Sequence, residues 1–291
     1  MAVMNLPTRL AFQSVVVATD FSPHSDIALA CAAVIARRSK GKVCIAHVIA
    51  PPVWPLGGPE DLHPALCQKK RWAEKKMCGL LKSEKLRAVS TDVLLKEGEF
   101  RTVLCNATRD YQADLLIVGT RGRKGLSKLL FGSTAEEVCH SAPCPVMLIG
   151  PNVSTRREIK FDRILFPSDL SAPSLGALPS VLAFAEQHGS LLKFVRLLSE
   201  GEGQDSTVAL CQLERDYMPT FTARTRLLKP PEFAVNFGDS AAEILRMARE
   251  WRADLVAIGA HRPGTLASHF PGDLVYEIVC DSTCPVLTIT E

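Results

Sequence analysis

The sequence predicts an α/β protein made of two repeated doubly wound domains, each a five-stranded parallel sheet flanked by helices. Three observations support this class. The chain has 291 residues, about twice the length of a typical domain. Its second half repeats motifs of its first half in the same order. Within each half, apolar strand-like runs alternate with helix-like segments, the order that the crossover connections of a parallel sheet require.

The repeat is a duplication of whole domains. ADLLIVG at residues 113–119 returns as ADLVAIG at residues 253–259, and VATDFS at residues 17–22 matches FPSDLS at residues 166–171. A repeat unit this long exceeds the roughly 20 to 50 residues of solenoid repeats. We place the joint between the domains in the polar stretch that starts at Pro151. The expected domains are 1–150 and 151–291.

The first half opens with a short buried strand and a capped helix. The β-branched run Ser14–Ala18 is apolar without alternation, as expected for a strand covered on both faces. Ser22 and Pro23 then supply an N-cap and a first-turn proline, and Gly41 marks the end of the helix.

The remaining elements continue the alternation. Further strands are predicted at Lys42–Ile49, about 91–96, Leu115–Val118 and Val146–Ile149, and further helices at roughly 64–88, 99–111 and 133–141. In the second half, Pro179 should interrupt the first helix because proline lacks an N–H group. The strands Val146–Ile149 and Val286–Ile289 both begin in a Cys-Pro-Val motif, and we expect them to pair across the two halves.

Composition and charge narrow the functional classes. Lys and Arg number 34 and Asp and Glu 31, and the resulting net charge of +3 gives no general reason to expect a nucleic acid or an acidic membrane as partner. Ten cysteines are too sparse for a disulfide-stapled secreted domain. The N-terminal residues lack a signal-peptide pattern, and no apolar run is long enough to span a membrane. We therefore expect a cytoplasmic protein.

The segment after the fourth strand carries the strongest ligand-binding pattern. Gly119, Gly122, Gly132 and Ser133 are spaced Gly-2x-Gly-9x-Gly-Ser. Glycines let the backbone approach a ligand closely. A helix that begins at Ser133 presents amides that stabilise an anion such as phosphate. Ligands of such sheets bind beyond the carboxyl ends of the strands, so the region after the first strand belongs to the same site.

Together these motifs resemble the nucleotide-binding universal stress proteins. The resemblance is carried by the glycine pattern, by Asp20-Phe21-Ser22 after the first strand and by Ala46–Ile49 at the end of the second. It extends over about 12–149 and 161–289. It implies a fold of the adenine-nucleotide alpha-hydrolase type that binds ATP, with or without Mg²⁺. It also implies that the paired modules form the family's dimer within one chain, and it leaves a homodimer of the whole chain open.

The resemblance implies a role for each matching residue. Ala18, which stands where the family commonly has Pro, Thr19 and Asp20 would line the adenosine end, with Asp20 near the ribose. Val48 would offer backbone contacts to adenine. The residues that would surround the phosphates are Gly119, Arg121, Gly122, Gly132, Ser133, Thr134 and Ala135. Val118, at the end of the fourth strand, is expected to belong to the same nucleotide site.

The second half departs from the pattern at two positions. Arg262 replaces the second glycine, and Asp273 replaces the serine after Gly272. The arginine side chain fills space that the backbone should leave to phosphate, and the aspartate puts a negative charge where another should bind. We expect this half to be a structural and regulatory partner of the first. Because Asp169 and His261 remain, an adenosine without phosphates or a different ligand stays an alternative.

The sequence therefore predicts an ATP-binding universal stress protein with little or no turnover, whose occupancy changes how it meets protein partners. Two alternatives stay open. One is a nucleotide hydrolase or adenylyl-transferring enzyme that uses Asp20 as a base or a magnesium ligand. The other is an interaction scaffold that binds no nucleotide. Neither a P-loop nor a Rossmann glycine pattern occurs in the sequence.

Other chemistry-bearing residues are interpreted as structural. Cys144 and Cys284 precede Pro and a strand and lack the Cys-x-x-Cys spacing of zinc sites, so we expect them in the core and expect no metal site. His47 should be a hydrogen-bonded core residue. The basic run 69–76, which contains Trp72, is interpreted as a solvated helix surface and not as a nucleic-acid-binding face.

Overall fold

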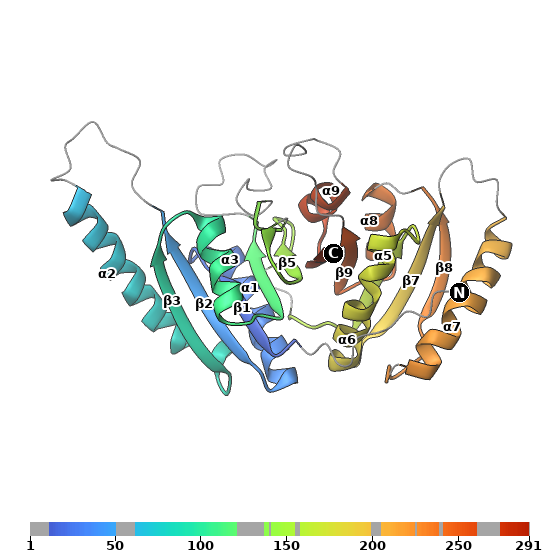
Figure 1. Ribbon diagram of the computed structural model, residues 1–291, viewed down its shortest axis with the longest axis horizontal. Helices are drawn as coiled ribbons and strands as arrows, with labels where there is room; N and C mark the ends of the chain where they lie inside the picture. The colour runs from blue at the N-terminus through green and yellow to red at the C-terminus, as the bar shows by residue number, and fades with distance from the viewer. Residues whose placement is uncertain are drawn as a thin grey trace.

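The structure contains one continuous ten-stranded sheet with helices on both faces (Figure 1). The computed structural model describes residues 12–50, 62–120, 137–139, 141–154, 158–198, 205–224, 226–238, 241–260 and 274–290. The first half supplies β1 (Ser14–Ala18), β2 (Lys42–Ile49), β3 (Ser90–Glu97), β4 (Leu115–Gly119) and β5 (Val146–Ile149). The second half supplies β6 (Arg163–Ser168), β7 (Leu191–Leu198), β8 (Glu232–Phe237), β9 (Leu255–Ala260) and β10 (Val286–Thr290). The strand order is β3-β2-β1-β4-β5-β10-β9-β6-β7-β8.

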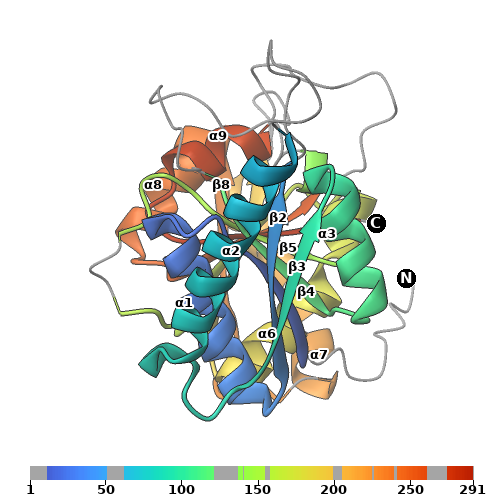
Figure 2. The ribbon, with the colours of Figure 1, turned by 90° about the vertical axis from the view of Figure 1, so that its left-hand side faces the viewer.

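The helices flank the sheet as the doubly wound class requires. The first half contains α1 (Pro23–Ser39), α2 (Leu62–Leu81), the short 3-10 helix η2 (Glu84–Leu86) and α3 (Phe100–Asp110). The second contains α5 (Ala172–Gly176), α6 (Leu178–His188), α7 (Ser206–Arg224), α8 (Ala241–Glu250) and α9 (Leu274–Asp281). Figure 2 shows α1 and α2 on one face of the first half and α3 on the other. Among the described residues, no helix has both the length and the apolar character of a membrane span.

The core extends through both halves on each face of the sheet. All residues of β1 and β5 are buried, which fits their unbroken apolar runs. One apolar cluster packs α1 and α6 on one face, and a second packs α3, α8 and α9 on the other. Because each cluster takes residues from both halves, the halves share their cores. The predicted α/β class is confirmed, and the two repeats are fused into one sheet.

The halves join through an antiparallel pairing of β5 with β10. Residues 146–148 lie opposite 286–288, whereas the other pairings between the described strands are parallel. This confirms the expectation that the last strands of the halves pair with each other. Just beyond β5, a Cβ on Gly150 would lie 2.0 Å from the carbonyl oxygen of Val279 in α9. Only glycine therefore fits where the chain leaves β5.

A second joint lies between α1 and α6. Arg38 Nε donates to the carbonyl oxygen of Gln187 at 2.9 Å, and Phe12 N donates to Gln187 Oε1 at 3.0 Å. The Phe12 ring meets the edge of Phe184, with 5.2 Å between the ring centroids. The Arg38 side chain and the backbone N–H of Phe12, both in the first half, thus bond Gln187 in the C-terminal turn of α6.

The helix predicted at about 64–88 is shorter than expected. α2 ends at Leu81 because Glu84 and Lys85, which are charged, stand where the apolar stripe of the helix would continue. The chain turns into η2 instead, which buries Leu86.

Two smaller predictions concern helix ends. α1 ends with Lys40 in the left-handed conformation, with φ 55° and ψ 35°, so the predicted stop at Gly41 comes one residue late. Gly41 is needed for space, because its Cβ would lie 2.1 Å from the carbonyl oxygen of Gln13. Pro179 interrupts the first helix of the second half, as predicted, and divides it into α5 and α6.

Candidate functional site

Six predicted site residues of the first half come together at the carboxyl ends of three strands. Because β1 pairs with β2 on one side and with β4 on the other, the strand order reverses at β1. Ala18 ends β1 and is followed by Thr19 and Asp20, Val48 lies near the end of β2, and residues 118–119 end β4. This is the edge where doubly wound sheets bind ligands.

A tight turn between β1 and α1 fixes Asp20. Asp20 Oδ1 accepts a hydrogen bond from Ser22 N at 3.0 Å, and Thr19 Oγ1 accepts one from Phe21 N at 3.0 Å. Phe21 has φ 62°, in the left-handed region that bulky residues rarely adopt. Ser22 then caps α1 by accepting from Ser25 N at 3.2 Å. The half-buried Asp20 carboxylate is thereby held at the end of β1, where it could accept hydrogen bonds from ligand hydroxyls.

The end of β2 provides backbone groups beside this turn. Ala46 O accepts from Thr19 N at 2.9 Å. Backbone groups two residues apart along a strand point the same way, so the N–H and C=O groups of Val48 point to the side of β1, as those of Ala46 do. Because β1 ends at Ala18, opposite Ala46, the groups of Val48 lie beyond the end of that strand. His47 Nδ1 lies 2.7 Å from Thr19 O, and because a carbonyl oxygen only accepts, Nδ1 donates. The expected hydrogen-bonded role of His47 is confirmed.

The end of β4 lies against the first turn of α1. A Cβ on Gly119 would lie 3.4 Å from backbone atoms of His24 and Ser25, so little space separates these segments. Thr120 is buried, and both its N–H and its hydroxyl donate to Ile149 O, at 3.0 and 3.1 Å. The Thr120 hydroxyl therefore fastens the chain after β4 to β5.

The other predicted phosphate-binding residues follow β4 in the sequence. Arg121, Gly122, Gly132, Ser133, Thr134 and Ala135 lie outside the described residues. The substituted positions Arg262 and Asp273 of the second half lie outside them too. The roles of all these residues stay predictions.

The second half repeats the turn after its first strand. Ser168 Oγ accepts from Leu170 N at 3.0 Å, and Asp169 Oδ1 accepts from Ser171 N at 2.9 Å. Leu170 has φ 62°, the value found at the corresponding residue of the first half. The fold thus preserves the position of the carboxylate in both halves.

The duplicated Ala-Asp motif has a structural role that the sequence did not reveal. Asp114 Oδ2 accepts from the backbone N–H groups of Gln13 and Ser14, at 2.9 and 2.8 Å. Asp254 Oδ2 accepts in the same way from the residues that lead into β6, both at 3.1 Å. Each carboxylate fastens the start of β1 or β6, at the sheet edge opposite the candidate site.

Sequence reasoning also missed two aromatic neighbours of the site. The Phe21 ring lies 4.6 Å from the His47 ring and 5.1 Å from the Trp72 ring, between centroids. Trp72 comes from α2 and was interpreted only as part of a basic helix surface. The available signal was an aromatic residue directly after Asp20, because such a residue in a turn needs other side chains to cover it.

Cysteines and metal ligands do not define a site in the described residues. No group of three or more His, Cys, Asp or Glu side chains there could hold a metal ion. Cys284 is buried, as expected, whereas Cys144 is only half-buried, so the expectation of a fully buried Cys144 was wrong. Burial nevertheless raises the pKa of the Cys144 thiol to about 12, as it does for Cys31. These thiols stay protonated at neutral pH and are weak nucleophiles.

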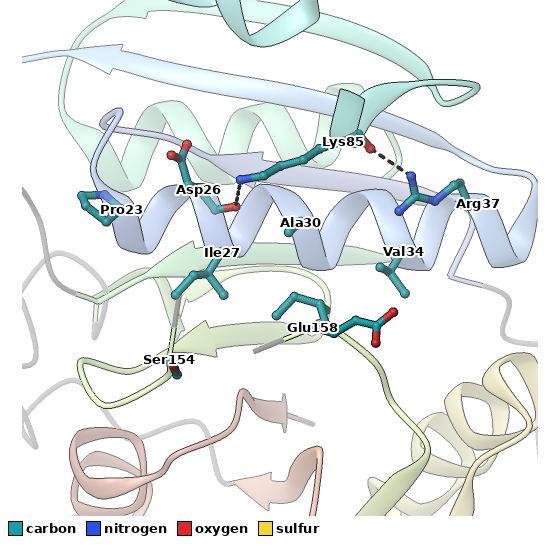
Figure 3. A pocket seen from close by; sticks show the side chains of 10 residues that line it. Pro23, Asp26, Ile27, Ala30, Val34, Arg37, Lys85, Ser154 and Glu158 are labelled. Carbon is teal, nitrogen blue, oxygen red and sulfur yellow. Dashed lines mark hydrogen bonds between the residues drawn. The ribbon is translucent and has the colours of Figure 1, made fainter. Parts of the chain in front are cut away.

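A surface cavity of about 550 Å³ lies away from the strand ends (Figure 3). Ile27, Ala30 and Val34 of α1 form one wall, and Figure 3 shows Glu158 across from them, in the segment that connects the halves. Lys85 reaches over α1 to the Asp26 carbonyl at 3.4 Å. The cavity contains none of the predicted site residues.

Comparison with known proteins agrees with the fold and the repeat. The universal stress protein family matches residues 11–150 and again residues 160–290. A universal stress protein of Mycolicibacterium smegmatis is 32% identical over 298 residues, covering 94% of this chain and 96% of that protein. One of Thermus aquaticus is 30% identical over 141 residues, 47% of this chain and 98% of its own length.

Among solved structures, a universal stress protein of Archaeoglobus fulgidus has the same fold. It superposes with a TM-score of 0.75 at 20% identity and covers 97% of this chain and 98% of its own. The family match spans most of the chain in two consecutive copies, and the M. smegmatis relative matches it nearly end to end. The chain therefore belongs to the universal stress protein family and contains two such domains in tandem.

Proposed function

We propose that the first domain binds ATP, with or without Mg²⁺, and that the protein is a nucleotide-dependent regulatory module of the stress response with little or no turnover. The observation that carries this proposal is the meeting of the Asp20 turn with the end of β4 at the strand-order reversal. Asp20 would accept hydrogen bonds from the ribose, and the backbone of Val48 would contact adenine. The glycine pattern that begins at Gly119 would surround the phosphates.

The second domain is proposed to support the first without binding a triphosphate. It keeps the Asp169 turn and contributes β10 to the shared sheet. Arg262 and Asp273 replace the glycine and the serine of the phosphate pattern. Their bulk and charge oppose a triphosphate in the pose proposed for the first domain.

The test is a matched pair of substitutions in the full chain. Asp20→Ala should weaken ATP binding at least tenfold in calorimetry, because a charged acceptor of ribose hydrogen bonds is removed. Asp169→Ala removes the corresponding carboxylate of the second domain and should leave the affinity unchanged. Gly122→Arg, which introduces the residue found at Arg262, should abolish binding without changing the urea midpoint of unfolding. Equal effects of the two aspartate substitutions would refute the assignment to the first domain.

The same preparations separate this proposal from the other functional classes. Multiple turnovers of ATP with Mg²⁺ that disappear in Asp20→Ala would identify an enzyme. Protein that retains no nucleotide on purification and shows no measurable ATP binding would be an interaction scaffold. Mass spectrometry of the small molecules released from purified protein is the first measurement to make, because it identifies the nucleotide without a prior choice.

A further inference from the structure

The turn that carries Asp20 contains a strained backbone conformation at Phe21. Phe21, with φ 62°, is a bulky residue in left-handed backbone, where its Cβ crowds neighbouring backbone atoms. The hydrogen bonds of Thr19 Oγ1 to Phe21 N and of Asp20 Oδ1 to Ser22 N hold the turn from within. Any contact that fixes the Phe21 ring therefore also fixes the direction of the neighbouring carboxylate.

The rings of Phe21, His47 and Trp72 pack together beside this turn. The Phe21 and Trp72 rings meet edge to face at 88°, the Phe21 ring is tilted by 43° on His47, and 6.4 Å separates the His47 and Trp72 centroids. The His47 ring is anchored in turn by its bond to Thr19 O. Two of the rings thus belong to strand ends that form the site, and the third comes from the outer helix α2. Edge-to-face pairs are attractive beyond the area they bury.

The second domain shows that the turn does not need this arrangement to form. It has the same φ of 62° and the same two internal hydrogen bonds. At the positions of Phe21 and His47, however, it has Leu170 and Arg196. The aromatic cluster is therefore confined to the domain that keeps the glycine pattern. This difference favours a role in ligand binding over a general role in folding.

From this comparison we infer that Trp72 is a positioning residue of the nucleotide site: through Phe21 it fixes the turn that orients Asp20 toward the ribose. The inference rests on the function proposed above and extends it to a residue of α2. Trp72 is 37% exposed, and Lys76 lies 5.9 Å from its ring, so the ring also connects the turn to the basic surface of α2. If ligand binding moves the Asp20 turn, the contacts of Phe21 with Trp72 and of Trp72 with Lys76 would transmit the movement to that surface.

The first experiment measures the turn without any ligand. Amide hydrogen exchange of the full chain is compared between wild type and Trp72→Ala. We expect exchange to become at least threefold faster at Phe21 and Ser22, whose N–H groups make the internal bonds of the turn, and to stay unchanged at Leu170 and Ser171. Unchanged exchange at Phe21, or equal acceleration in both turns, would overturn the inference.

The second experiment measures ATP affinity in the presence of Mg²⁺. Loss of one edge-to-face pair corresponds to about a two- to tenfold weaker affinity in Trp72→Ala. Trp72→Phe keeps an aromatic ring and should restore most of the affinity. Trp251→Ala is the matched control, because it removes a ring of the second domain that packs under Arg163 and Lys193. It should leave the affinity unchanged.

The outcomes distinguish the positioning role of Trp72 from the proposed binding of ATP by the first domain. Wild type that binds ATP, with Trp72→Ala binding equally well, overturns the positioning role and leaves the proposed function intact. Wild type that binds no ATP overturns the proposed function, while the exchange data still decide whether Trp72 fixes the turn. An equal loss of affinity in Trp72→Ala and Trp251→Ala would indicate general destabilisation and would also overturn the inference.

Discussion

His188 should make the stability of this protein depend on pH below neutrality. It lies in the last turn of α6, stacked on Phe184 at 4.5 Å and edge to face with Phe161 at 5.1 Å, between ring centroids. Burial, and next the positive charge of Arg38, lower its pKa from 6.5 to about 4, although Asp162 opposes the shift. The neutral ring is therefore the form that the α1–α6 joint accommodates.

The sign and size of the effect follow from this shift. Because unfolding raises the pKa, the unfolded chain binds the proton more tightly, and acid favours unfolding. The stabilisation is complete above pH 6.5 and is lost as the pH falls from 6.5 toward 4. A difference of about 2.5 pKa units corresponds to about 3 kcal/mol when fully expressed, and to about 2 kcal/mol at pH 5.

The assay compares wild type with His188→Phe by urea unfolding between pH 8 and pH 4.5. Phenylalanine preserves the ring packing, and the buried Nε2 of His188 has no hydrogen-bond partner among the described residues, so stability at pH 8 should change little. At pH 5 the variant should be more stable than wild type by about 2 kcal/mol, because it has no proton to take up. Parallel stability curves for the two proteins would refute the reasoning. Carboxylates titrate alike in both and cancel in the difference.

Four further substitutions test the packing described above, each by the free energy of unfolding in urea. Gly150→Ala should cost about 1–3 kcal/mol, because its Cβ would lie 2.0 Å from the Val279 carbonyl, and an unchanged midpoint would contradict the close approach of β5 to α9. Gly79→Ala, where nothing lies within 4 Å of the added Cβ, should instead stabilise α2 by about 0.5–1 kcal/mol. A loss there would point to an unseen contact. Asp114→Ala should cost about 1–3 kcal/mol through two unpaired backbone N–H groups, and Asp254→Ala a similar amount. A large difference between these two would show that the anchors are not equivalent.

Local patterns predicted most of the fold because the duplicated motifs occur at strand ends. The Pro179 break and the pairing of β5 with β10 were predictable, since one follows from a missing N–H and the other from matching terminal strands. The end of α2 was not predicted, because Glu84 and Lys85 are good helix formers and so conceal the loss of the apolar stripe. The role of Gly41 was not predictable either, because it depends on the space beside Gln13, which is a tertiary contact.

The candidate site was predictable to the extent that its residues follow strands. Asp20, Val48 and Gly119 could be placed together because each stands at the carboxyl end of a predicted parallel strand, and in the structure these three strands are neighbours. Trp72 could not, because its contact with Phe21 depends on how α2 packs over β2 and β3. The anchoring role of Asp114 was equally hidden, since the bonds it accepts come from residues about a hundred positions away. Long-range contacts of this kind leave no local pattern.

Fusing the two repeats makes the pairing of β5 with β10 insensitive to dilution. In a dimer of separate subunits, the same edges would come together only above a certain protein concentration, whereas here one chain keeps its partner strand at a fixed, high effective concentration. Two strand edges that would otherwise attract other chains are thereby covered permanently, leaving β3 and β8 at the ends of the sheet. The second domain can therefore serve as a permanent cover for the first whatever residues occupy its own glycine pattern.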